Sequence, residues 1–490
     1  MSYNLHVYPP LRPERREIRV LMLFPSSFDD PIRCELEILS LDERPQYEAL
    51  SYVWSIPPGN TDIIFRGKHR AVTRNLGLAL RRLRKMKDVR KIWVDALCID
   101  QDDKAEKESQ VSLMGEIYRR AAEVFIWLGD SVTLAPIDNL TIEQRPDLPW
   151  TGKAFDDLFT MVAEGPSTYI FQKFGDIEVD PEARLLEWED DKEKLRDPGL
   201  AALWLLYTLT SGCHMNELPC FVWDDDDKML KLSGKRFQAA FKALVDLLSL
   251  PWWTRIWVVQ EAVLPPKATV VLGSLHAQWD MLAAASNFFE LHLATCCSTL
   301  FNRLDSEYKN AIELCMVRIR EVTTERDRYQ ATGSVRDAFD LIWQYRNREA
   351  TDPRDMVYGL LGIASDLGGN GGITPDYSCS RHELYLRTAL LIIRRTKTLR
   401  ILEGIRHEEF EMPSWVPDWS ATIDARLWLH ERTRLRCSEY QASGGVHCSA
   451  QLGANASLLI NGIYVDTVVT VCQIVGPDES GSSLAQHLQG

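Results

Sequence analysis

The run from Lys91 to Asp130 constrains the fold of this chain more than any other stretch. It contains two apolar segments, Ile92–Leu97 and Val124–Leu128, that have the length and composition of buried strands. Between them an acidic loop leads into a helix whose apolar residues recur at helical spacing: Val111, Met114, Ile117, Tyr118 and Ala121. This order predicts a parallel sheet in which the two apolar segments are adjacent interior strands.

The acidic loop is the first place where we expect a binding site. In parallel sheets ligands bind beyond the carboxyl ends of the strands. Six polar or thiol side chains lie at or just after the end of the first predicted strand: Asp95, Cys98, Asp100, Gln101, Asp102 and Asp103. We therefore expect a pocket at this edge of the sheet.

The rest of the chain predicts an α/β fold with further parts. Strand patterns at 18–23, 32–39 and 47–54, a hairpin at 62–73 and a helix at 75–85 precede the central run. The periodicity is mainly helical from Met281 to Arg395, and short strands follow Leu399. We predict a mostly parallel sheet flanked by helices, a mainly helical second region and a small β-rich C-terminal part. The expected divisions are an N-terminal β extension at 1–46, a domain at 47–262, a helical region at 263–400 and a β-rich region at 401–490, with the composition of a tail or cut end after Pro477.

Composition and charge exclude several classes of partner. A net charge of -14 over 490 residues disfavours nucleic acid and anionic membranes. No apolar run approaches the ~20 residues that a membrane helix needs, and no signal peptide is visible. Eleven cysteines without a CxxC pair indicate reduced thiols and a cytoplasmic location. Cys213, His214 and Cys220 lack a second pair at finger-like spacing, so no metal site is predicted.

Several ordered motifs resemble the fungal heterokaryon-incompatibility (HET) domain family over roughly residues 47–262. They are YEALSYVW, NLGLALRRLR, KIWVDALCIDQDD, the Glu106-Lys107 pair, QVSLMGEIY, AAEVFIWLGD and RIWVVQEA, and the later TDPRDMVYGLLGI and PSWVPDWS resemble segments that follow such domains. The chain departs from the family at Ser55, where glycine is usual, and at Asp100, where asparagine is usual.

The resemblance implies a role in non-self recognition during hyphal fusion, with cell death or growth arrest as the output. It allows three hypotheses: an effector that acts through self-association or protein partners, an NAD-cleaving enzyme and a catalytically inactive adaptor. The enzyme hypothesis comes from the likeness of HET domains to Toll/interleukin-1-receptor (TIR) domains, some of which cleave NAD. A TIR-like or flavodoxin-like topology is compatible with the predicted sheet, although topology does not establish a reaction.

Glu106 is the first catalytic candidate under the enzyme hypothesis. Cleavage of the nicotinamide–ribose bond builds positive charge on the sugar, and a carboxylate beside the ring would stabilise it. However, Asp103-Lys104-Ala105-Glu106 also has the form of a capping box, in which Glu106 only stabilises a helix start.

Asp95 is the second catalytic candidate, since a buried carboxylate in a strand needs partners. It would bind a ribose hydroxyl or orient Glu106, or else it would bond to backbone amides or to Arg84. The other candidate nucleotide contacts are Ser51, Tyr52, Trp54, Trp93, Asp100 and Gln101. The two tryptophans are more typical of core packing, and Ser51 and Tyr52 of strand packing.

Three smaller features complete the sequence evidence. Cys98 would need a histidine to act as a nucleophile, and a cysteine at an apolar strand end is usually inert. Arg354 and Asp355 are expected to form a charge pair and a cap at a helix start. PSWVPDWS is expected to be a rigid aromatic turn packed on the HET domain.

Overall fold

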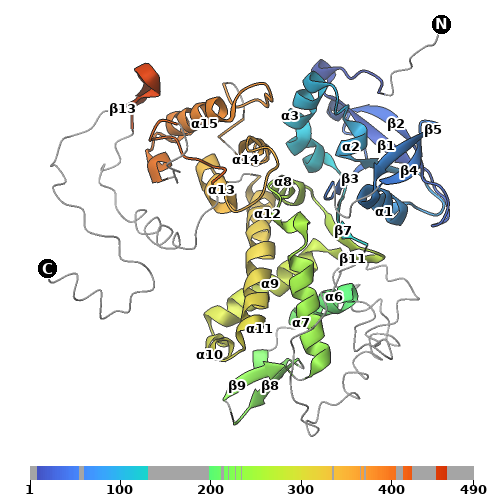
Figure 1. Ribbon diagram of the computed structural model, residues 1–490, viewed down its shortest axis with the longest axis vertical. Coiled ribbons are helices and arrows are strands. Elements are labelled where there is room, and N and C mark those ends of the chain that lie inside the picture. Colours follow the sequence, from blue (N-terminus) through green and yellow to red (C-terminus); the bar gives the residue numbers. More distant parts are fainter. Residues whose placement is uncertain are drawn as a thin grey trace, which may run out of the picture. The chain divides into compact units, whose positions relative to one another are not determined.

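The protein comprises two compact units, which together contain all described elements (Figure 1). The first unit is residues 1–335 and the second is residues 336–490. The computed structural model describes residues 8–54, 60–130, 198–210, 214–218, 220–226, 228–232, 234–333, 336–364, 366–368, 371–403, 412–421 and 448–460. Ser55 and Cys213 lie outside these ranges.

A nine-stranded sheet organises the first unit, with the strand order β11-β10-β7-β3-β6-β1-β2-β4-β5. The bounds are β1 Glu17–Leu23, β2 Arg33–Ser40, β3 Glu48–Ser51, β4 Asn60–Phe65, β5 Lys68–Thr73, β6 Arg90–Trp93, β7 Val124–Gly129, β10 Ala268–Leu272 and β11 Leu275–Gln278. The central strands β10, β7, β3 and β6 are parallel, whereas the β11, β1 and β5 pairings are antiparallel. The predicted α/β class is therefore confirmed, and β10 and β11 extend the sheet beyond residue 262.

The predicted adjacency of the two apolar segments is wrong. Strands β6 and β7 are parallel members of one sheet, but β3 lies between them and pairs with both. Ala49 of β3 is paired with Trp93 of β6 on one side and with Val124 of β7 on the other. The segment that carries the motif YEALSYVW is thus the central strand of the site region.

The first apolar segment also ends earlier than its composition indicates. Strand β6 stops at Trp93, and residues Asp95–Cys98 form the short helix α2. Leu97 and Cys98 are buried in that helix, which explains why the run reads as one buried strand. Asp95 therefore begins a helical turn and does not interrupt a strand.

Helices cover both faces of the central strands. They are α1 Arg74–Leu83, α3 Lys104–Arg120 and α8 Val258–Val263. Asn75 of α1 accepts a hydrogen bond from the Trp127 indole on one face (2.7 Å), while Tyr118 of α3 packs edge-on against Trp93 on the other. Because side chains alternate along a strand, Ser51 shares the face of Trp93 with α3.

A helical part completes the first unit. Its elements are α6 Pro198–Leu209, η3 Met215–Glu217, β8 Phe221–Asp224, β9 Met229–Leu232, α7 Lys235–Leu248, η4 Pro251–Thr254, α9 Trp279–Ala294, α10 Ser298–Asn302, α11 Ser306–Cys315, η5 Met316–Arg320 and α12 Glu321–Thr332. Trp252, Trp253 and Trp279 are fully buried and contact one another, with ring centroids 4.9–6.4 Å apart. This aromatic cluster joins the helices to the segment that follows α7.

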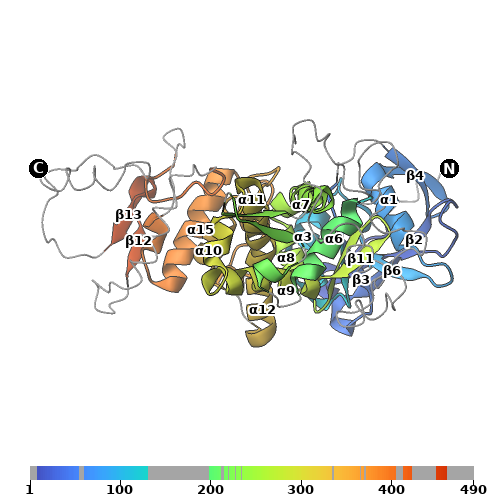
Figure 2. The same ribbon diagram turned by 90° about the horizontal axis from the view of Figure 1, so that it is seen from below.

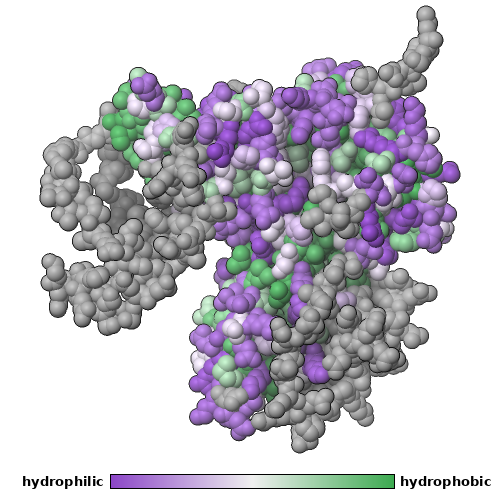
Figure 3. Space-filling model, viewed as in Figure 1, coloured by the Kyte–Doolittle hydropathy of each residue, from purple (hydrophilic) through white to green (hydrophobic). Residues whose placement is uncertain are grey.

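The second unit is built around α15. Its elements are α13 Ala338–Tyr345, α14 Asp355–Tyr358, α15 Arg381–Thr396, η6 Arg400–Glu403, β12 Ala450–Leu452, η8 Ala454–Ala456 and β13 Leu458–Ile460. Strands β12 and β13 form a small antiparallel pair (Figure 2). The predicted helical region and small β-rich end are therefore present. In Figure 3 apolar residues gather over this pair, where Leu452, Leu459 and Ile460 are exposed.

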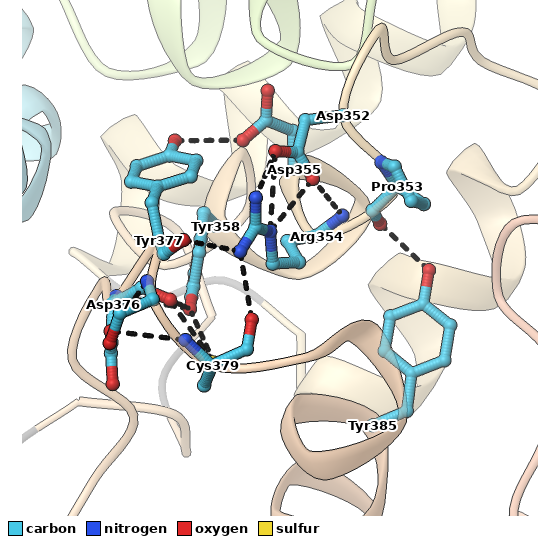
Figure 4. A network of polar contacts seen from close by, with 10 residues as sticks. Asp352, Pro353, Arg354, Asp355, Tyr358, Asp376, Tyr377, Cys379 and Tyr385 are labelled. Atoms are coloured by element: carbon cyan, nitrogen blue, oxygen red, sulfur yellow. Dashed lines mark hydrogen bonds and ion pairs between the residues drawn. The ribbon is translucent and has the colours of Figure 1, made fainter.

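Arg354 anchors the motif TDPRDMVYGLLG within this unit (Figure 4). Its guanidinium binds both oxygens of Asp352 and donates to the carbonyls of Tyr377 (2.6 Å) and Cys379 (2.8 Å). Asp355, the expected charge partner, instead accepts a hydrogen bond from the Tyr377 hydroxyl (2.8 Å). The motif thus ties α14 to the loop before α15.

The aromatic turn PSWVPDWS packs against other residues of the second unit. The Trp415 indole donates to the Ala456 carbonyl (2.9 Å), and the Trp419 ring lies 4.9 Å from that of Tyr385. Among the described helices of both units, none is long and apolar enough to cross a membrane.

Candidate functional site

A buried polar cluster lies at the carboxyl end of β3, the central parallel strand. Ser51, the last residue of that strand, donates its hydroxyl hydrogen to Oε2 of Glu261 and accepts one from the Trp252 indole (2.7 Å). Glu261 belongs to α8 and is 2 % exposed. The pairing joins the motif SYVW to the motif RIWVVQEA, which is more than 200 residues away in sequence.

Arg255 is the cation of this cluster. Its guanidinium donates to the carbonyl of Tyr52, the residue after β3. Its positive charge lowers the pKa of both Asp95 and Glu261, although other causes outweigh it. Arg255 therefore acts on both carboxyl groups through its charge.

Asp95 is held at the start of α2. Its carboxylate accepts hydrogen bonds from the Trp54 indole (2.8 Å) and from the amide of Ala96 (2.7 Å). Its backbone carbonyl accepts a bond from the Gln101 side chain (3.1 Å). Arg84, the alternative partner considered from sequence, instead donates to carbonyls in the loop from Ser27 to Pro31.

Burial raises the pKa values of the two carboxyl groups in this cluster. Loss of solvation raises the pKa of Glu261 to about 7, against the lowering effects of Arg255 and Ser51. The pKa of Asp95 is raised for the same reason, against the lowering effects of the Trp54 hydrogen bond and the Arg255 charge. Both carboxyl groups therefore take up protons more readily than exposed ones do, which is a feature of functional sites.

Glu106 lies outside this cluster and forms an ion pair with Arg19. Arg19 of β1, which is fully buried, binds its carboxylate in a bidentate fashion, at 2.5 Å and 2.7 Å. The amide of Asp100 donates to the same carboxylate (2.7 Å). Arg19 also donates to the carbonyls of Pro9 (2.9 Å) and Cys98 (3.1 Å), so that the pair fastens the N-terminal segment to the acidic loop.

The predicted capping box is correct for Asp103 and not for Glu106. Asp103 is the N-cap of α3, and its carboxylate accepts from the amides of Ala105 and Glu106. Glu106, however, bonds to the amide of Asp100 and not to that of Asp103. The Asp100 carboxylate accepts from the Asp102 amide (3.2 Å), which stabilises the turn between them.

A cleft of about 430 Å³ lies beside the Arg19–Glu106 pair. Its lining includes Tyr8, Arg19, Asp100, Asp103 and Glu106. The oxygens of Glu106 are already bonded to Arg19 and Asp100, so this carboxylate has little capacity left for a sugar ring.

The remaining sequence candidates fall into two groups. Tyr52 and Trp54 lie in the Asp95 cluster, where Tyr52 is buried and Trp54 is 40 % exposed. Trp93 is fully buried against Tyr118 and belongs to the core. Cys98 is buried as well, and burial raises the pKa of its thiol to about 12, which makes it an unreactive nucleophile.

Comparison with known proteins matches the part of the chain that contains β3, α2 and α3. Residues 47–156 match the family described as "Heterokaryon incompatibility protein (HET)". The chain contains a HET domain. Ser51, Asp95 and Glu106 fall within the matched residues of that domain, whereas Arg255 and Glu261 lie outside them. No solved structure matches the chain.

A curated relative extends the similarity beyond the HET domain. The chain is 25% identical over 458 residues to "Heterokaryon incompatibility protein 6, OR allele" from Neurospora crassa. The alignment covers 86% of this chain and 60% of the relative, so the chain spans less than two thirds of that protein's length.

Arg255 and Glu261 were not among the residues predicted for the site. Both belong to RIWVVQEA, which contributed to the family resemblance without an assigned role. The available signal was a glutamate within the apolar run Ile256–Val263, since such a carboxylate needs partners inside the protein.

Proposed function

We propose that this HET-domain protein acts in fungal heterokaryon incompatibility and that the cluster around Glu261 is required for its output. The observation that carries the proposal is the buried carboxyl group of Glu261 at the carboxyl end of the central strands, which accepts a hydrogen bond from Ser51 and whose pKa is raised by burial to about 7. Such an arrangement costs folding free energy, and strained or incompletely compensated groups concentrate at functional sites.

The proposed output is growth arrest or cell death after fusion of unlike hyphae. The support is the HET-domain match together with the similarity to the N. crassa incompatibility protein. We propose that self-association or a protein partner starts the response, and that the Glu261 cluster sets the active conformation of the HET domain.

Forced heterokaryons test this role. Neurospora crassa strains with and without the chain are fused, and growth rate and uptake of a vital dye are measured. Wild type is expected to slow growth and increase dye uptake, and Arg255→Gln is expected to abolish both effects. Arg320→Gln is the matched control, because Arg320 pairs with Glu290 at a partly exposed position of the same unit. Normal growth with the wild-type chain would reject the proposal.

An NAD-cleaving activity is the second candidate, favoured by the position of Trp54 and Asp95. The Trp54 ring is 40 % exposed, and its indole binds a carboxyl group that lies at the sheet end where ligands bind. A ribose held there would place its developing positive charge near Asp95, with the ring of Trp54 available for stacking.

Incubation of concentrated protein with NAD tests this candidate through nicotinamide release. Asp95→Asn is expected to lower the rate by about a hundredfold or more. Glu106→Gln is expected to retain release, because both Glu106 oxygens already have protein partners. Absence of release from wild type under assembling conditions would remove the enzyme and leave the adaptor or effector.

A further inference from the structure

Four side chains with nitrogen or sulfur donors converge at the far end of α9 from the sheet. His292 lies in the last turn of α9, Cys296 and Cys297 lie in the turn before α10, and His214 precedes η3. Helix α9 has 16 residues and begins directly after β11, so its two ends are about 24 Å apart (Figure 1). The group is therefore separate from the Glu261 cluster.

The donor atoms of these four residues all lie within 4.8 Å of one another. The two sulfurs are 3.8 Å apart. The distances from His292 Nδ1 to the sulfurs of Cys296 and Cys297 are 3.4 Å and 3.5 Å, and His214 Nδ1 is 3.7 Å from the Cys297 sulfur.

The four sulfur–sulfur and sulfur–nitrogen distances are close to those in a tetrahedral zinc site. With zinc bonds of about 2.3 Å to sulfur and about 2.0 Å to nitrogen, tetrahedral geometry places two sulfurs about 3.8 Å apart and a sulfur and a nitrogen about 3.5 Å apart. A disulfide requires sulfurs about 2.0 Å apart, so the adjacent cysteines are not joined in this arrangement.

Neighbouring groups fix the positions of the donors. The amide of Cys297 donates to the His292 carbonyl (2.7 Å), and the amide of Met215 approaches the Cys297 sulfur (3.5 Å). The Phe288 ring stacks on the His292 ring, with centroids 4.2 Å apart. Contacts of this kind around metal ligands hold the ligands in orientation and tune the affinity for the metal.

We propose that His214, His292, Cys296 and Cys297 bind a single zinc ion. Two thiolates and two imidazoles form a common ligand set for structural zinc, and four protein ligands leave no open position for a substrate. Binding releases the two thiol protons to solvent.

The ion would have a structural role in the first unit. It would link the end of α9 to the segment before the β8–β9 pair, 78 positions earlier in the sequence. His292 and Cys297 are buried, whereas His214 and Cys296 are exposed, so that zinc and chelators can reach the site. The sequence does not reveal it, because His292, Cys296 and Cys297 are far from His214 and have no CxxC spacing.

Metal analysis of the purified full chain provides the test. The chain is reconstituted with zinc under reducing conditions, and unbound metal is removed by gel filtration. Elemental mass spectrometry is then expected to find one zinc ion per chain. Cys296→Ser and His214→Ala are expected to lose it. Cys448→Ser and His69→Ala, at sites outside the cluster, are expected to keep it. Wild-type protein without zinc, or ligand variants with a full complement, would overturn the proposal.

Cobalt substitution tests the ligand set in the wild-type chain and does not depend on how well the variants fold. Tetrahedral cobalt bound by two thiolates is expected to give intense visible bands and a thiolate-to-metal charge-transfer band in the near ultraviolet. A weak spectrum of octahedral type, without the charge-transfer band, would contradict the proposed site.

Discussion

Two carboxylate clusters near the central strands of the HET-domain unit differ in how their charge is balanced. Glu106 has its own guanidinium, and Arg19 binds it with two short hydrogen bonds. Glu261 instead accepts from the neutral Ser51 hydroxyl and Asp95 from the neutral Trp54 indole, and burial raises the pKa of both carboxyl groups. The difference indicates that the Glu106 pair stabilises the fold, whereas burial of the Glu261 cluster carries a cost that the proposed function would explain.

The largest effect is expected on removal of the Arg19 guanidinium. Arg19→Met leaves the Glu106 carboxylate and the carbonyls of Pro9 and Cys98 without their donor, and breaking such a buried pair costs about 3–5 kcal/mol. Urea unfolding of the full chain measures the loss. Arg15→Met is the control, since the Arg15 side chain is 48% exposed and its pair with the exposed Glu43 is worth about 0–1 kcal/mol. Equal losses in the two variants would show that the pair has no special structural role.

The pH dependence of stability is the next largest expected effect. The pKa of Glu261 is about 7 in the folded protein and 4.5 without the protein environment, so the folded state binds more protons between these values. Its contribution to the free energy of unfolding is therefore full below pH 4.5 and falls, by about 3 kcal/mol in total, as pH rises through 7. In Glu261→Gln this decline is expected to disappear.

Unfolding curves at a series of pH values from 5 to 8 check this expectation. The stability of wild type relative to Glu261→Gln should fall from pH 5 to about pH 7 and level off above it. Glu290→Gln, a partly exposed carboxylate of α9, should follow wild type at every pH. A difference between wild type and Glu261→Gln that does not change with pH would mean that the Glu261 pKa is not raised.

Arg354 of the second unit has the same kind of contacts as Arg19 at a less buried position, so it tests how burial affects the stability that such an arginine contributes. It binds Asp352 in a bidentate fashion and also donates to two carbonyls, but its side chain is 21% exposed. Arg354→Lys keeps the charge and loses the planar fork, with an expected cost of about 2 kcal/mol. Thermal unfolding monitored in the second unit measures it. A loss as large as that of Arg19→Met would mean that burial does not govern these costs.

The helix cap gives the smallest expected effect. Asp103→Ala removes the acceptor for two amides at the start of α3 and is expected to cost about 1 kcal/mol. Asp102→Ala, at the neighbouring exposed position, is the control. If Asp103→Ala also abolished incompatibility at equal protein levels, the acidic loop would belong to the functional site.

The sequence predicted where the strands and helices lie along the chain better than it predicted which strands are adjacent in the sheet. Period and composition located the strands around Tyr47, Ile92 and Val124, since each has a buried face. They did not reveal that β3 lies between β6 and β7, because strand order depends on contacts far apart in sequence. The end of β6 at Trp93 was missed since the apolar residues Leu97 and Cys98 are buried equally well in a helix.

The site was predictable only in part for the same reason. Ser51, Asp95, Tyr52 and Trp54 were candidates because they lie at or near the ends of recognised strands. Their charged partners, Arg255 and Glu261, come from a helix and a turn about 200 residues later, and no local pattern links the two segments. Glu106 fitted both a catalytic and a capping pattern, and its partner Arg19 lies 87 positions earlier.

The most direct test of the central claim is to measure stability and hyphal death for Glu106→Gln and Glu261→Gln side by side, at matched protein levels. The account predicts that Glu106→Gln is less stable than wild type and still causes death, whereas Glu261→Gln is at least as stable at pH 8 and causes none. Loss of death in Glu106→Gln together with normal death in Glu261→Gln would contradict it.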